Sequence, residues 1–155
     1  MSNLRSKLIL DIRKFQNETP NGIIAAPETD NILKWNVIIF GPDGTPWEDG
    51  IFKLLLEFND DSEQTYPQCP PIIHFRTPIF HPNVNEDGSL DPKKAEIKWS
   101  SDCDIKYLLE TIQQLLVTPN LSSPENNEAA SLFNNDIEQY NRLVRHYTEI
   151  SWTHI

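Results

Sequence analysis

Hydrophobic residues recur in three stretches of the chain at intervals of three to four, a spacing that places them on one face of an α-helix. This pattern predicts a helix over residues 3–17, a second over residues 105–116, and a long third helix from Ala130 to about Ile150. Asp102 or Asp104 can cap the second helix, because an aspartate side chain accepts hydrogen bonds from the unpaired N–H groups of a first turn. The residues between the first two helices follow a different pattern.

Apolar residues alternate there with polar ones, a spacing of two that is typical of strands. Four such runs occur, in residues 22–26, 35–39, 52–58 and 72–75. Successive strands followed by helices favour an antiparallel meander in a fold of the α+β class. The chain has 155 residues, a length that suits a single domain, and we expect that domain to span residues 1–155.

Acidic residues outnumber basic ones by 23 to 13, which gives a net charge of −10. This charge disfavours nonspecific binding to nucleic acids or to membrane surfaces, which are themselves negatively charged. The apolar run Leu8 to Leu10 is too short for a signal peptide or a membrane span, so we expect a cytoplasmic or nuclear protein. The two cysteines, Cys69 and Cys103, lack the spacing of metal ligands and predict neither a disulfide framework nor a metal site.

The stretch from Phe80 to Trp99 carries the clearest sign of a functional site. It begins with His81-Pro82-Asn83 directly after an apolar strand, and the proline forces the backbone to leave the sheet. Asn83 then offers an amide hydrogen-bond donor from a rigid position, and Asp87-Gly88 adds a tight turn. A rigid loop that aims one polar group is typical of an active site.

The order of these motifs resembles the ubiquitin-conjugating enzymes over nearly the whole chain. The resemblance implies the ubiquitin-conjugating (UBC) fold, with an N-terminal helix, a four-stranded antiparallel meander and C-terminal helices. Ser151-Trp152 is most similar to the branch of the family known for DNA repair and histone ubiquitination. The motifs that carry the resemblance are Trp35-Asn36, Ile39-Phe40-Gly41-Pro42, Gly44-Thr45-Pro46, Glu48-Asp49-Gly50, Tyr66-Pro67, Pro70-Pro71, His81-Pro82-Asn83, Gly88-Ser89, Trp99 and Pro119-Asn120.

The resemblance implies a place in the transfer of ubiquitin, or of a related modifier, from an activating enzyme to a lysine. The expected partners are the modifier, the activating enzyme, and a ligase or a second conjugating enzyme. ATP is consumed by the activating enzyme, so no cofactor is expected in this chain. Family members bind these partners through the first helix, two loops and the outer face of the sheet; the matching residues are Arg5, Lys7, Gln68, Ser100, Ser101, Asp102 and Ile24.

One residue departs from the family's pattern at the position that carries the chemistry. Family members have a catalytic cysteine three residues after the glycine that matches Gly88, and a gapless alignment puts Asp91 there. A gapped alignment would match Leu90-Asp91 to the Leu-Asp pair after the family's cysteine, and so delete the cysteine. In the same resemblance Asn83, with His81 beside it in the motif, supports the active-site loop or stabilises the oxyanion.

Aspartate cannot replace a cysteine in this reaction. A cysteine thiolate carries the acyl group as a thioester that stays reactive toward amines. An aspartyl anhydride would hydrolyse in an exposed groove, and the carboxylate would repel a developing oxyanion. We therefore predict a protein without thioester activity of its own that acts as a binding or regulatory subunit. The alternative is an active conjugating enzyme, working through Cys103 or with the Asp91 region atypical or in error.

Two further residues are candidates for the active-site region. Cys103 precedes a helix N-terminus, whose dipole favours a thiolate, whereas Asp102 and Asp104 on either side oppose its ionisation. Ser123, followed by a proline, matches the position where relatives have an acidic or serine residue that gates the site. It is a candidate for proline-directed phosphorylation or, in the favoured interpretation, for the N-cap of the last helical region.

Overall fold

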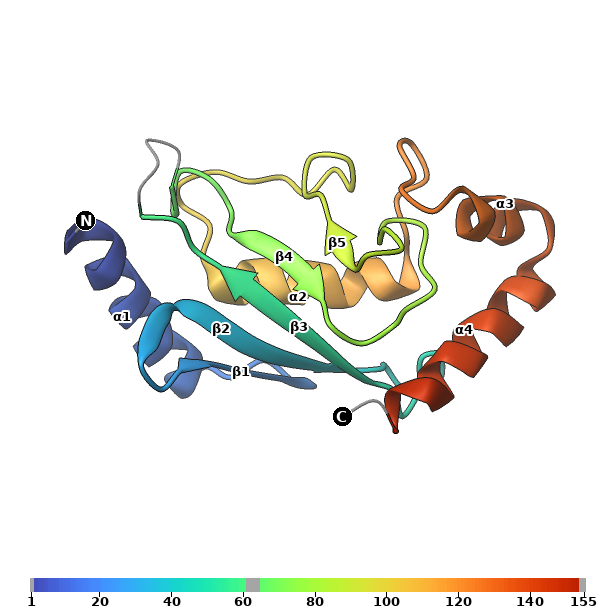
Figure 1. The fold of residues 1–155 in the computed structure, drawn as a ribbon, viewed down its shortest axis with the longest axis horizontal. Coiled ribbons are helices and arrows are strands. Elements are labelled where there is room, and N and C mark those ends of the chain that lie inside the picture. Colours follow the sequence, from blue (N-terminus) through green and yellow to red (C-terminus); the bar gives the residue numbers. More distant parts are fainter. Residues whose placement is uncertain (1, 61–64, 154–155) are drawn as a thin grey trace.

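A computed structural model describes residues 2–60 and 65–153, with side chains from residue 4 onward. The predicted α+β fold is confirmed: one N-terminal helix, an antiparallel meander and C-terminal helices follow in that order (Figure 1). The elements are α1 (Ser2–Asn17), β1 (Ile23–Glu28), β2 (Asn31–Phe40), β3 (Ile51–Glu57), β4 (Ile72–Phe75), β5 (Ser89–Leu90), α2 (Ile105–Val117), α3 (Asn127–Asn135) and α4 (Ile137–Ser151).

The five strands form one antiparallel sheet in the order β1-β2-β3-β4-β5. The first four are the predicted meander. The fifth strand was not predicted, because its two residues are too few to show an alternating pattern. In β5, Leu90 is opposite Ile73 and Ser89 is opposite His74, so the chain that follows the His-Pro-Asn loop is fixed to the sheet edge.

Helix α2 covers one face of this sheet, and its predicted apolar stripe is buried there. The side chain of Asp104, rather than Asp102, caps the helix by accepting a hydrogen bond of 2.8 Å from the N–H of Tyr107. In the described ranges, residues 2–60 and 65–153, no helix covers the opposite face of the sheet (Figure 1), and Ile24 is exposed there. The buried residues of α2 are Ile105, Leu108, Leu109, Ile112, Leu115 and Leu116.

The prediction of one long helix after Ala130 is wrong in one respect. The structure has two helices there, α3 and α4, which meet at Asp136. The backbone of Asp136 is not helical (φ −151°, ψ 76°), and its N–H donates to the carbonyl of Leu132 at the end of α3. Its side chain then accepts from the N–H of Gln139 and caps the start of α4. The apolar spacing continues across this break, so hydrophobic periodicity alone does not reveal it.

The end of α4 is hydrogen-bonded to the turn between β2 and β3. Arg145 donates to the carbonyl of Glu48 at 2.7 Å, Trp152 donates to the carbonyl of Asp49 at 2.8 Å, and Ser151 Oγ accepts from the N–H of Ile51 at 3.0 Å. The same turn carries Trp47, a buried side chain whose ring lies 5.9 Å from the ring of His81. Helix α4 thus supports the His-Pro-Asn loop indirectly, through Trp47.

Candidate functional site

A glycine fixes the turn that carries the chain from the His-Pro-Asn loop into β5. Gly88 has a φ of +94°, and a Cβ atom there would lie 2.2 Å from the carbonyl oxygen of Phe75. This close approach comes with a hydrogen bond of 2.7 Å from the N–H of Phe75 to the carbonyl of Gly88. Only glycine fits such a position without strain. The turn therefore determines where residues 89–91 lie against the sheet.

His81 is buried, and both ring nitrogens have partners. Nε2 lies 2.7 Å from the carbonyl of Leu115, so it must donate, and Nδ1 accepts from the N–H of Asn83 at 3.0 Å. This arrangement requires the neutral imidazole with its proton on Nε2. Burial lowers the pKa of His81 to about 4, against a smaller raising effect of the Leu115 carbonyl. His81 thus anchors the loop to the C-terminal end of α2 and is not exposed for proton transfer.

Asn83 is also buried, and its amide pairs with the backbone of one residue. Its Nδ2 donates to the carbonyl of Asn120 at 2.7 Å, and its Oδ1 accepts from the N–H of Asn120 at 2.9 Å. The loop after α2 is held further by Pro82, whose carbonyl accepts from the N–H groups of Glu125 and Asn126. The His-Pro-Asn motif therefore joins the end of α2 to residues 120–126.

Asp91 is exposed and begins a compact turn immediately after β5. Its carboxylate accepts from the N–H of Lys93 at 2.9 Å, and its carbonyl accepts from the N–H of Ala95 at 3.0 Å. These are the contacts of an N-cap residue, in which the side chain satisfies an N–H group of the first turn. The Asp91 carboxylate is thus engaged in local structure.

Two side-chain contacts connect the turn after Asp91 to the loop after α2. Lys94 Nζ lies 2.7 Å from Glu125 Oε1, and Asn120 Nδ2 donates to Glu96 Oε2 at 3.0 Å. Asn85 Nδ2 donates to the other oxygen of Glu125 at 3.2 Å. The sequence alone does not identify Lys94, Glu96 or Glu125 as site residues, because Lys94 and Glu96 are more than 20 residues from their partners in the loop after α2 and no local motif joins them.

Cys103 lies at the other end of α2 from the His-Pro-Asn loop. Because α2 rises about 1.5 Å per residue, Cys103 is on the order of 18 Å from Leu115, the residue that His81 contacts. Its sulfur accepts from the N–H of Ser100 at 3.4 Å. The structure therefore brings Asn83, His81 and Asp91 into one region and leaves Cys103 outside it.

Ser123 lies in the loop that contacts the His-Pro-Asn motif, where its side chain is exposed. The prediction that it caps a helix is wrong. Asn126 caps α3 instead, because its side chain accepts from the N–H of Ala129 at 3.0 Å. The backbone of Asn126 is fixed by Pro82, which sets where the helix begins.

The candidate partner-binding residues fall into two groups. The first group lies on α1 and on the two loops around Gln68 and around Ser100, and these three segments are in contact. Trp99 donates to the carbonyl of Pro67 at 2.8 Å, which joins the loops, and Lys14 of α1 pairs with Asp104 at 2.6 Å.

The two candidates on α1 both form ion pairs. Arg5 pairs with Asp60, and Lys7 pairs with the buried carboxylate of Asp11. Exposed on the two loops are Gln68, Ser100, Ser101 and Asp102, whereas Ile24 lies on the outer face of the sheet.

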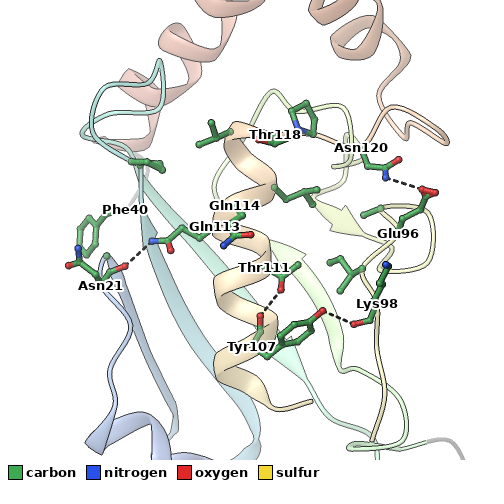
Figure 2. Close-up of a pocket in the computed structure, with 18 of the residues that line it drawn as sticks. Asn21, Phe40, Glu96, Lys98, Tyr107, Thr111, Gln113, Gln114, Thr118 and Asn120 are labelled. Carbon is green, nitrogen blue, oxygen red and sulfur yellow. Dashed lines mark hydrogen bonds between the residues drawn. The ribbon is translucent and has the colours of Figure 1, made fainter. Parts of the chain in front are cut away.

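A groove of about 1180 Å³ runs along the outer side of α2. One wall is the segment from Ala95 to Lys98, and the other comes from Asn21 and the start of the β2–β3 turn (Figure 2). Tyr107 donates to the carbonyl of Lys98 at 2.8 Å at one end, and the Asn120–Glu96 contact lies at the other. Asp91 precedes the Ala95–Lys98 wall in the chain but does not itself line the groove.

The described residues offer neither a metal site nor a membrane span. Within residues 2–60 and 65–153, no group of three or more His, Cys, Asp or Glu side chains is arranged to hold a metal ion. Among the helices in those ranges, none is long and apolar enough to cross a membrane.

Comparisons with known proteins agree with the geometry. A family model described as ubiquitin-conjugating enzyme matches residues 7–148. Ubiquitin-conjugating enzyme E2 3 of Arabidopsis thaliana is 43% identical to the chain over 148 residues, which is 96% of each protein. Ubiquitin-conjugating enzyme E2 2 of Yarrowia lipolytica is 40% identical over 149 residues, with the same coverage. Ubiquitin-conjugating enzyme E2 1 of Caenorhabditis elegans is 43% identical over 148 residues, 96% of this chain and 75% of the relative.

Proposed function

Because this chain belongs to the ubiquitin-conjugating enzyme family, we propose that it acts in ubiquitination as a binding or regulatory subunit without thioester activity of its own. The observation that carries the proposal is Asp91 at the position of the nucleophile. Leu90 is buried in β5 opposite Ile73, and the next residue is the first exposed one after the strand. This favours the gapless alignment, in which Leu90 matches an apolar residue of the family and Asp91 matches the cysteine.

The chemistry of a carboxylate supports the same proposal. An acyl carrier needs a nucleophile whose acyl derivative survives in water long enough to meet an amine, and a thioester does so whereas an exposed anhydride does not. The carboxylate of Asp91 is also bound to the N–H of Lys93 as a cap. Its role in our proposal is structural.

A displaced nucleophile at Cys103 is the less favoured alternative. An acyl group on Cys103 would be roughly three turns of helix away from Asn83. The sulfur contacts the N–H of Ser100 at 3.4 Å, and Asp104, the next residue, caps α2 and pairs with Lys14, so the described contacts of Cys103 are all with its own loop.

The partner surfaces in this proposal are those of the family. The first helix and the two loops joined by Trp99 and Pro67 would bind an activating enzyme, a ligase or a second conjugating enzyme. The outer face of the sheet around Ile24 would bind ubiquitin or a related modifier. Ser151-Trp152 favours the DNA-repair and histone branch, and with it a place in the cytoplasm or nucleus.

A non-reducing thioester assay tests the proposal. The wild-type chain and its Cys103→Ser variant would be mixed with activating enzyme, ubiquitin and ATP, and the Arabidopsis relative would serve as the positive control. We expect a thiol-sensitive adduct with the relative and none with either form of this chain. A thiol-sensitive adduct of the wild type that the serine variant lacks would make Cys103 the nucleophile and overturn the proposal.

A further inference from the structure

Lys94 takes no part in the proposed function. Its ammonium group lies 2.7 Å from Glu125, whose side chain is only 13% exposed and is held by Asn85 and by the contact of its N–H with Pro82. The Glu125 carboxylate is therefore held by groups other than Lys94. A fixed carboxylate next to an amine is the arrangement that orients the amine and takes its proton when the amine attacks a carbonyl.

Lys94 is also close to residue 91. The hydrogen bond from the N–H of Ala95 to the carbonyl of Asp91 makes one helical turn, and side chains three residues apart on such a turn are neighbours, with Cβ atoms about 5–6 Å apart. The hydrogen bond to Glu125 and the charge of that carboxylate raise the pKa of Lys94, and the charge of the Asp91 carboxylate adds a smaller raising effect. Lys93, two residues from Asp91, lies on a different side of the turn.

We infer that Lys94 is a built-in acceptor amine. It lies beside residue 91 and Glu125, in the place that the lysine of a substrate would need. In the wild-type chain this excludes other amines from the site. The inference rests on the proposed function only in taking residue 91 as the nucleophile position. It also explains why a cysteine and Lys94 are incompatible here: an acyl group on residue 91 would be transferred to the chain itself.

The transfer is balanced without any further reactant. With Asp91→Cys, the nitrogen of Lys94 attacks the carbonyl carbon of a thioester on the introduced sulfur. A carbon–nitrogen bond forms, the carbon–sulfur bond breaks, and the thiolate leaves. The Lys94 ammonium group gives up two protons in this reaction: one passes to Glu125 before the neutral nitrogen attacks, and the other passes to the departing thiolate. The product is an amide that thiols do not cleave.

The first test uses full-length Asp91→Cys protein in a Cys69→Ser, Cys103→Ser background. The acyl donor is a ubiquitin mercaptoethanesulfonate thioester, which exchanges onto a thiol without activating enzyme. We expect a thiol-resistant adduct that peptide mapping places on residue 94. Adding Lys94→Arg should lower this adduct at least tenfold and leave a thiol-sensitive thioester, whereas adding Lys93→Arg, the matched control, should leave the adduct unchanged.

Three results would overturn the inference: a stable thioester with Lys94 intact, a resistant adduct that Lys94→Arg leaves unchanged, or a resistant adduct on another lysine. If neither variant is acylated at all, residue 91 is not at the transfer position and the premise fails with the inference. A wild-type chain active through Cys103 would overturn only the proposed function, because this experiment contains neither Cys103 nor activating enzyme.

A second measurement needs no substitution. A water-soluble carbodiimide activates carboxylates of the wild-type chain, and a neighbouring amine captures them as an amide with loss of one water. We expect mapped cross-links from Lys94 to Glu125 or Asp91, and at least tenfold fewer from Lys93 to either residue. Equal cross-linking of the two lysines would contradict the inference even if the Asp91→Cys protein did not fold.

Discussion

Replacing Asn83 with alanine is expected to lower the free energy of unfolding by about 3 kcal/mol. The substitution removes two hydrogen bonds, of 2.7 and 2.9 Å, and leaves the N–H and the carbonyl of Asn120 without their partners. Asn83 is buried, so water cannot simply take the place of its amide. Urea denaturation followed by tryptophan fluorescence measures the change, and the slope of the transition should stay the same.

Asn120→Ala is the matched control. It removes only the side chain of Asn120, which contacts Glu96 and the N–H of Ser122, and it keeps both backbone bonds to Asn83. Its side-chain bonds are exposed, and we expect a loss of no more than about 1 kcal/mol. A loss for Asn83→Ala as small as that of the control would mean that the reciprocal pair does not stabilise the fold.

In our proposal, a structural role for Asn83 explains how a chain with Asp91 at the nucleophile position can have the His-Pro-Asn motif. His81 binds the last turn of α2 through Leu115, and Asn83 binds the loop that follows it. Loss of either contact would free the end of α2 from the sheet edge. The motif therefore has a structural use that does not depend on thioester chemistry.

The regular elements could be predicted from sequence because their signals are local. Six apolar residues at helical spacing predicted α2, and the sequence left Asp102 and Asp104 as its two candidate caps, of which the structure selects Asp104. The break at Asp136 could not be recognised. Its neighbours keep the apolar spacing, and the non-helical backbone of that residue, with φ −151° and ψ 76°, does not change the hydrophobic pattern.

The candidate site could be predicted only in part, for the same physical reason. The tripeptide at residues 81–83 and the lack of a cysteine between Cys69 and Cys103 can be read directly from the order of residues. The ion pair between Lys94 and Glu125 joins segments that come together only when residues 120–126 fold onto Pro82. Charge alone does not predict it, since acidic residues are common throughout this chain.

Acidification is expected to destabilise this protein through His81 in addition to its carboxylates. The pKa of His81 is about 4 in the folded chain, where burial disfavours the charged ring, and about 6.5 when the chain is unfolded. Between these values the unfolded chain binds one more proton. Stability from this group is therefore complete above pH 6.5, falls as the pH drops toward 4, and is lost below that, a total of about 3 kcal/mol.

The measurement is the free energy of unfolding at several pH values between 4 and 7, for the wild type and for His81→Gln. A glutamine amide can donate to Leu115 O but does not titrate, so the variant should start less stable and lose less with falling pH. His146→Gln, at an exposed position, controls for the removal of one imidazole from the chain. Parallel profiles for the wild type and His81→Gln would show that His81 does not remain neutral in the fold. A protonated ring would still donate from Nε2 to the carbonyl of Leu115, but its Nδ1 would carry a proton and could not accept from the N–H of Asn83.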